Sequence, residues 1–111
     1  MSSAAIMMIT CPSAAVAKKL ASSAVKSRLA ACGNIIPGMT SIYEWKGEIC
    51  EEEETYLLLK TEKSMSEEVI NFVKENHPYD VPCIVSVPIE TGNPEFLKWV
   101  KDMTGEKTVQ E

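Results

Sequence analysis

His77 is the single histidine of this 111-residue chain, and it precedes Pro78-Tyr79 directly after an expected helix end. A neutral imidazole is the commonest metal donor in proteins, so His77 could bind copper or zinc. No His or Cys stands near it in the sequence at a typical ligand spacing. A histidine at a helix end can also bond a backbone carbonyl or line a subunit boundary. The pattern alone favours this structural role over a metal-binding role.

Four thiols offer further donors, at Cys11, Cys32, Cys50 and Cys83. They are widely spaced and form no Cys-x-x-Cys pair. The start of the chain lacks the basic leading region and long apolar run of a signal peptide, so we expect reduced cysteines and a cytoplasmic protein.

Acidic side chains form a run from Glu51 to Glu54. Calcium or magnesium would need several of these oxygens to converge. Successive side chains of a strand point to opposite faces, so at most two of the four can do so. A solvated face that discourages edge pairing is the favoured interpretation, with Glu54 as the acid that stands just before the apolar end of its strand.

Aromatic residues with polar tips are typical of interfaces and pocket walls. The functional hypothesis is a cleft between subunits, lined by Tyr43, Trp45, Glu54, His77, Tyr79 and Trp99. Plain core and interface packing explains the aromatic residues equally well, and both interpretations stay open.

Catalysis has little support, because the chain has no Gly-x-Ser-x-Gly elbow, phosphate-binding glycine loop or His-Glu-x-x-His motif. We therefore expect that it is not an enzyme. A net charge of −5 argues against a nucleic-acid partner, and no apolar stretch approaches the ~20 residues that span a membrane.

The elements that must position these residues alternate between strand and helix. Ala5–Thr10 is a short apolar run suited to a central strand. Ser13 is placed to cap a helix whose apolar residues recur every three or four positions through Leu29 and Cys32, and Gly33 is expected to end it.

Two long strands follow, Asn34–Trp45 and Ile49–Thr61, joined by a turn at residues 46–48. Pro37-Gly38 should bend the first of them. Both exceed the usual strand length, so this hairpin should overhang a small sheet and need a partner to cover it.

The last part of the chain predicts two more helices around a strand. Ser64 and Glu67 form a capping box for a helix that must end near His77, before Pro78. Ile84–Ile89 is the final strand. Asn93 should cap a terminal helix that buries its apolar residues, namely Phe96, Leu97, Trp99 and Val100.

The expected fold is therefore one α+β domain over residues 1–111, with a core of about 5–103 and a polar tail at 104–111. Its order is the ferredoxin-like β-α-β-β-α-β arrangement plus a C-terminal helix. Right-handed crossovers should place both main helices on one face of the sheet.

Two blocks carry a family resemblance. Residues 28–49 combine a small-residue helix end, a bent strand with aromatic residues and a reversal at Lys46-Gly47, and residues 77–82 read His-Pro-Tyr-Asp-Val-Pro. Together they resemble the CutA family, named for divalent-cation tolerance, and the likeness runs from about Ile6 to Trp99. The resemblance implies a homotrimer in which neighbouring sheets join, and an association with copper.

The copper-binding members of that family carry a cysteine on the first strand and two adjacent histidines before the Pro-Tyr. Here those positions hold Ile9, Asn76 and His77, so only the second histidine is kept. Cys83 stands where many members have glutamate, and Cys11 would face the same side of the strand as Ile9.

We thus expect any metal site to centre on His77, with Cys11, Cys83 or Glu54 joining it by folding or from the next subunit. Affinity for Cu(II) should be weaker than the intact set would give, and a thiol donor would favour Cu(I). The leading hypothesis is a trimeric binding protein for copper or another divalent cation. The alternative is a trimeric scaffold or small-ligand sensor in which metal contact is incidental.

Overall fold

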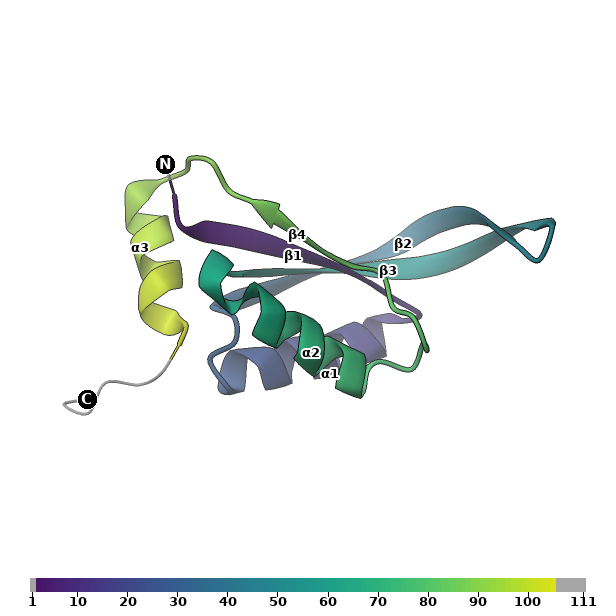
Figure 1. The fold of residues 1–111 in the computed structure, drawn as a ribbon, viewed down its shortest axis with the longest axis horizontal. Coiled ribbons are helices and arrows are strands. Elements are labelled where there is room, and N and C mark those ends of the chain that lie inside the picture. The colour runs from purple at the N-terminus through teal and green to yellow at the C-terminus, as the bar shows by residue number, and fades with distance from the viewer. Residues whose placement is uncertain (1, 106–111) are drawn as a thin grey trace.

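The computed structural model describes residues 2–105 and contains a four-stranded antiparallel sheet and three α-helices. In chain order the elements are β1 (Ala4–Cys11), α1 (Ala14–Lys26), β2 (Cys32–Trp45), β3 (Glu48–Glu62), a 3₁₀ turn (Lys63–Met65), α2 (Ser66–Asn76), β4 (Ile84–Pro88) and α3 (Pro94–Met103). The strands lie in the order β2-β3-β1-β4. Helices α1 and α2 cover one face, and α3 lies at the end of the sheet away from the hairpin tip (Figure 1). The predicted element order is confirmed.

The core lies between this face of the sheet and the two main helices. Alternate residues of the central strands β1 and β3 are fully buried, among them Met7, Ile9, Leu57 and Leu59. They pack against the apolar faces of α1 and α2. Apolar residues alternate along the strands and recur every three or four positions along the helices. Because each period marks the buried face of its element, the sequence predicts both layers.

The β2–β3 hairpin extends far beyond the rest of the sheet, in a molecule measuring 54 × 26 × 22 Å (Figure 1). A bulge between Ile36 and Met39 bends β2 where Pro37-Gly38 predicted a bend. The reversal is a two-residue turn in which Lys46 and Gly47 both have positive φ, 52° and 84°. Such a turn matches the natural twist of the two strands.

The predicted end of the first helix was wrong. Helix α1 ends at Lys26, and the left-handed residue that follows is Arg28, with φ 65°, rather than Gly33. Cys32 and Gly33 instead begin β2. Position 33 is crowded, because a Cβ there would lie 3.0 Å from a Leu59 methyl and 3.1 Å from the Ala21 Cβ, so a larger residue would make these neighbours shift.

The capping box was also wrong. Ser64 lies inside the 3₁₀ turn, and the residue before α2 is Met65, which makes no side-chain cap. The end of α2 at Asn76 and the Asn93 cap of α3, whose side chain accepts from the Glu95 N–H at 3.0 Å, are confirmed.

Helix α3 buries less than predicted. Val100 is fully buried and Leu97 partly so, but Phe96 and Trp99 are 37% and 41% exposed. The helix covers only a small patch of Ala4 and Ala31, which leaves its other apolar residues uncovered. Thr104, predicted to begin a frayed tail, is buried and donates to the carbonyl of Val100 at 3.0 Å. The remainder of the predicted tail, 106–111, lies outside the described residues.

Candidate functional site

A cavity of about 920 Å³ is lined by both strands of the hairpin and by the segment that follows α2. The end of β1, both hairpin strands and this segment contribute side chains to it. The lining residues are Thr10, Tyr43, Trp45, Cys50, Glu52, Glu54, Pro78, Tyr79, Asp80, Val81 and Cys83. We call this cavity the hairpin cleft.

Two tyrosine–carboxylate pairs organise the hairpin cleft. Tyr43 Oη donates to Glu52 Oε1 at 2.8 Å, and Tyr79 Oη donates to Glu54 Oε2 at 2.6 Å. Glu52 and Glu54 are two residues apart on β3 and therefore share one face. This agrees with the expectation that at most two of the four consecutive glutamates converge.

Both hydrogen bonds hold the tyrosines in their neutral form. The bond to Glu52 raises the pKa of Tyr43 to about 12. Burial raises the pKa of Tyr79, and the bond to Glu54 raises it further. A phenolate next to a carboxylate would be repelled, so these hydroxyl groups remain donors across the physiological range.

His77 lies behind the hairpin cleft and is 9% exposed. Its Nε2 is 2.8 Å from the carbonyl oxygen of Thr10, and its Nδ1 is 3.1 Å from the backbone N of Tyr79. A carbonyl can only accept and an amide N–H can only donate, so Nε2 carries the proton and Nδ1 accepts. Both ring nitrogens are thus engaged, and the imidazole ties the segment after α2 to β1.

The thiols of the predicted metal set lie in different environments. Cys11 is fully buried, and burial followed by the nearby Glu54 charge raises its pKa to about 11. Cys83 is exposed and lines the hairpin cleft. Within residues 2–105, no three His, Cys, Asp or Glu side chains are grouped closely enough to hold a metal ion.

Tyr43, Trp45, Glu54 and Tyr79 line the hairpin cleft, whereas His77 and Trp99 of the predicted set do not, and a cleft between subunits stays a prediction. Trp99 lies on α3, and its ring centroid is 5.8 Å from that of Phe96. The reason is topological, because α3 lies at the end of the sheet away from the hairpin tip (Figure 1).

Sequence reasoning missed six lining residues, of which three carry ionisable groups, Cys50, Glu52 and Asp80. Glu52 could have been found from strand alternation, because it stands two residues before Glu54 and so shares its face of β3. Cys50 stands opposite Tyr43 in the hairpin register, which only the length of the turn defines. No local signal marked Asp80.

The family model for "CutA1 divalent ion tolerance protein" matches residues 5–103. The chain is 47% identical over 96 residues to Protein CutA of Mus musculus, and 48% identical over 100 residues to the divalent-cation tolerance protein CutA of Thermus thermophilus. These matches cover 86% and 90% of this chain, and they cover 54% of the mouse protein and 97% of the Thermus protein. The chain therefore spans about half the length of the mouse relative.

Solved structures share the fold. The CutA1 structure from Oryza sativa superimposes with a TM-score of 0.91 at 38% identity, covering 96% of this chain and 97% of that one. The Thermus thermophilus structure gives 0.89 at 47% identity, covering 92% and 99%. Relatives differ in the compartment they are named for, chloroplastic in Arabidopsis thaliana and periplasmic in Archaeoglobus fulgidus. No helix among the described residues is long and apolar enough to cross a membrane.

Proposed function

The chain belongs to the CutA1 divalent ion tolerance protein family, and from this premise we propose that it is a homotrimeric binding protein that takes a divalent cation, copper first, at a cleft between subunits. Members of this family are described as tolerance proteins, which agrees with the prediction that the chain is not an enzyme. The observation that carries the proposal is the hairpin cleft, whose acids and thiols line one cavity but form no group of three metal donors among residues 2–105 of one chain.

Self-association is supported by the uncovered surface of the hairpin. Ile42, Trp45 and Ile49 are 66%, 62% and 70% exposed, an unusual concentration of large apolar side chains on a projecting element. Covering such a patch is favourable, since each Å² of apolar surface removed from water contributes roughly 25 cal/mol. A ring of three chains would cover the hairpins and place a neighbour's side chains at the cleft.

The proposed donors are the cavity-lining Cys83, Glu52 and Asp80, joined by groups of the neighbouring subunit. A metal at His77 would require the ring to give up a hydrogen bond to Thr10 or Tyr79. Cys11 is sealed in the core and its raised pKa disfavours the thiolate that binds metals. Cys83 would favour Cu(I), whereas the carboxylates suit harder ions.

The test starts with metal analysis of the purified protein after dialysis against a weak chelator, with light scattering on the same sample. We expect stoichiometric copper and three times the 12.2 kDa chain mass. Calorimetric titration with copper should lose its tightest event in Cys83→Ser and keep it in His77→Ala. Cys32→Ser is the matched control, because Cys32 does not line the cleft. If His77→Ala is the only variant that loses the tightest binding event, copper binds at His77 rather than at Cys83.

A small-ligand sensor or scaffold is the second candidate function. A cavity of about 920 Å³ with aromatic walls is within the usual range for organic ligands. A protein that is trimeric but retains no metal after dialysis would favour this candidate. A monomer would contradict both functions.

The cytoplasm is the proposed compartment, on the evidence of reduced-thiol chemistry, since all four cysteines are free. Fractionation of the native host with an antibody to the protein tests it. Recovery in an organelle or periplasmic fraction, as the names of two relatives suggest for those proteins, would overturn it.

A further inference from the structure

The carboxylate of Glu54 is held in the wall of the hairpin cleft with one oxygen free. Glu54 is 8% exposed, and its Oε2 accepts from Tyr79 Oη at 2.6 Å. No group of the described residues donates to Oε1. This oxygen is not sealed off, because the one side-chain polar atom of residues 2–105 that is both inaccessible and without a partner is Glu62 Oε2. Glu54 therefore presents an open acceptor to the cavity that it lines.

The carboxylates of the hairpin cleft have no cation among them. Glu52, Glu54 and Asp80 line the cleft, and none of its described lining residues is a lysine, an arginine or a histidine. The one ion pair within residues 2–105 joins two residues of α3, so these three carboxylates have no ionic partner there. Their charge reaches the surroundings, since burial and then the Glu54 charge raise the pKa of Cys11 to about 11. The cleft therefore attracts cations and repels anions.

Aromatic rings form another part of the wall, at Tyr43, Trp45 and Tyr79. The face of such a ring attracts a positive charge that lies within about 6 Å of its centroid. Trp45 shows this directly, because Lys46 Nζ lies 5.7 Å from its ring centroid. Lys46 itself does not line the cleft. Carboxylates and ring faces in one wall favour a cation that also has an apolar body.

The free oxygen of Glu54 selects among cations. A metal ion would need several grouped donors, and residues 2–105 group no three of them. Guanidinium prefers both oxygens of one carboxylate, but Oε2 is already occupied by Tyr79. A quaternary ammonium has no N–H and would leave Oε1 without a donor. A primary ammonium needs one acceptor for each N–H, and a cavity of about 920 Å³ has room for the organic group that it carries.

We propose that the hairpin cleft binds an amine with an aromatic or alkyl body, whose primary ammonium group donates to Glu54 Oε1 and whose body packs on Tyr43 and Tyr79. This inference names a ligand class for the small-ligand candidate proposed above and rests on it. Every group that it uses belongs to one chain, whereas the copper site needs donors from a neighbouring subunit. The two proposals can therefore fail separately.

The test is an NMR titration of the full-length protein, dialysed against the weak chelator, with phenethylammonium chloride at constant ionic strength. We expect saturable shifts of the backbone amides of Glu54 and Tyr79. The neutral analogue 2-phenylethanol has the same ring and should bind at least about tenfold more weakly, because the charge-assisted hydrogen bond is lost. Ammonium chloride, which lacks the apolar body, should give no saturable shift.

Phenylalanine separates simple amines from amino acids, because it carries the same ring and ammonium group together with a carboxylate. That carboxylate would meet acidic side chains with no cation in the described wall, so we expect binding at least about tenfold weaker than that of phenethylammonium. These comparisons use the parent protein alone, so they do not depend on the folding of any variant.

A matched pair of variants assigns the contact. Glu54→Gln should weaken phenethylammonium binding at least about tenfold, because a neutral amide replaces the charged acceptor. Glu53→Gln makes the same charge change at the exposed neighbouring position, on the opposite face of β3 and outside the cleft, and should bind as the parent does.

The proposal is overturned if phenethylammonium gives no saturable shift, if 2-phenylethanol or phenylalanine binds as tightly, or if Glu54→Gln binds as the parent does. Light scattering and copper titration of the same samples separate this outcome from failure of the proposed function. A trimer that binds copper but not the amine would overturn the amine site alone. A monomer that binds the amine would overturn the trimer and keep the amine site.

Discussion

At the residue scale, the hairpin cleft depends on side chains whose protonation states are set by their neighbours. Tyr79 is kept neutral by burial and by Glu54, and the same Glu54 charge adds to the burial that keeps Cys11 protonated. Glu54 is thus shared between a buried thiol and a cleft tyrosine. The alkaline stability of the protein should report on this arrangement.

The protein should lose part of its free energy of unfolding in alkali as the Cys11 thiol ionises. Its folded pKa of about 11 lies above its ordinary value of 9.0, so its contribution is fully present below about pH 9 and is lost as the pH rises to about 11. This difference in pKa corresponds to about 3 kcal/mol. Guanidinium unfolding of the parent and of Cys11→Ala measures the free energy of unfolding across this pH range. That free energy should fall less with pH in the variant than in the parent. Parallel curves would mean that the thiol does not titrate differently in the two states.

His77 should matter for stability through its two hydrogen bonds. His77→Ala leaves the Thr10 carbonyl and the Tyr79 N–H without their partner, and we expect a loss of about 2–3 kcal/mol at fixed protein concentration. Asn76→Ala is the control, since this exposed neighbour bonds only the Phe72 carbonyl of its own helix. Equal effects of the two substitutions in chemical denaturation would contradict the role given to His77.

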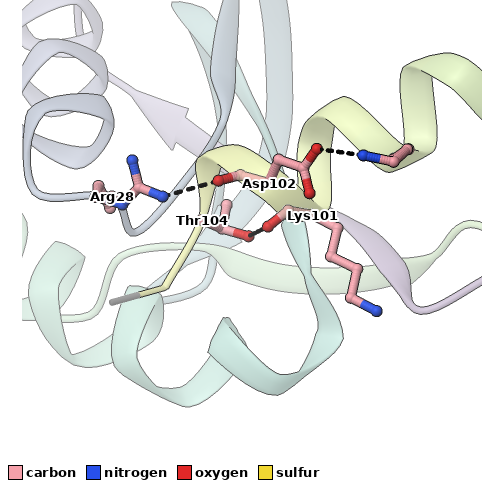
Figure 2. Close-up of polar contacts among 5 residues, drawn as sticks. Arg28, Lys101, Asp102 and Thr104 are labelled. Atoms are coloured by element: carbon pink, nitrogen blue, oxygen red, sulfur yellow. Dashed lines mark hydrogen bonds and ion pairs between the residues drawn. The ribbon is translucent and has the colours of Figure 1, made fainter. Parts of the chain in front are cut away.

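At the element scale, α3 is held to the rest of the fold by one side chain from the turn after α1. Arg28 donates through Nε to the carbonyl of Gly105 at 2.9 Å. Through a terminal nitrogen it donates to the carbonyl of Asp102 at 2.8 Å (Figure 2). The Gly105 N–H donates back to the Arg28 carbonyl at 2.9 Å. A cation here satisfies free carbonyls at a helix C-terminus and complements the helix dipole.

Substitutions of Arg28 should separate the contribution of its side-chain hydrogen bonds from the cost of its positive φ. Arg28→Ala should lose about 1–2 kcal/mol and speed hydrogen exchange of the α3 amides. Arg28→Gly should speed exchange equally but cost up to about 1 kcal/mol less, because glycine accepts the positive φ of 65° freely. Hydrogen exchange by mass spectrometry, with unfolding on the same samples, measures both. Unchanged α3 exchange in both variants would show that the helix is held by Val100 packing alone.

At the scale of the whole molecule, the hairpin makes the chain unusually long for its size. Large apolar side chains on the hairpin and the exposed Phe96–Trp99 pair on α3 are uncovered. These surfaces lie at different ends of the sheet (Figure 1). Different patches that meet head to tail can close into a ring, which agrees with the proposed trimer.

Trp45 should act as an anchor of that assembly. Trp45→Ala should lower the melting temperature by several degrees and make it more dependent on protein concentration, because folding and assembly are linked by mass action. Val25→Ala is a control, since this side chain is 40% exposed on α1 and lies outside both the hairpin and the hairpin cleft. An unchanged melting temperature in Trp45→Ala would mean that this side chain stays in water in the assembled protein.

Local sequence patterns were enough to predict the order of the helices and strands. Alternation in β1 and β3, the Asn93 cap, Pro78 after α2 and the bend at Pro37-Gly38 are determined by residues near each other in the chain. Local signals failed where a distant contact competed with them. Gly33 suggested a helix end, but it pairs with Leu59 in the β2–β3 ladder, and Ser64 suggested a cap inside what became a 3₁₀ turn.

The sequence by itself thus predicted the order of helices and strands, because strand alternation and helix spacing act over a few residues, and four of the six residues expected at the cleft line it. Tertiary structure alone decided which groups remain available for chemistry. It engaged both nitrogens of His77, buried Cys11, and separated Trp99 from the other aromatic residues. Among the described residues it also left Glu62 Oε2 without a hydrogen-bond partner, although the other oxygen accepts from Ser3, 59 residues away. Hydrogen-bond satisfaction depends on what the fold brings within about 3 Å, and no local pattern carries that information.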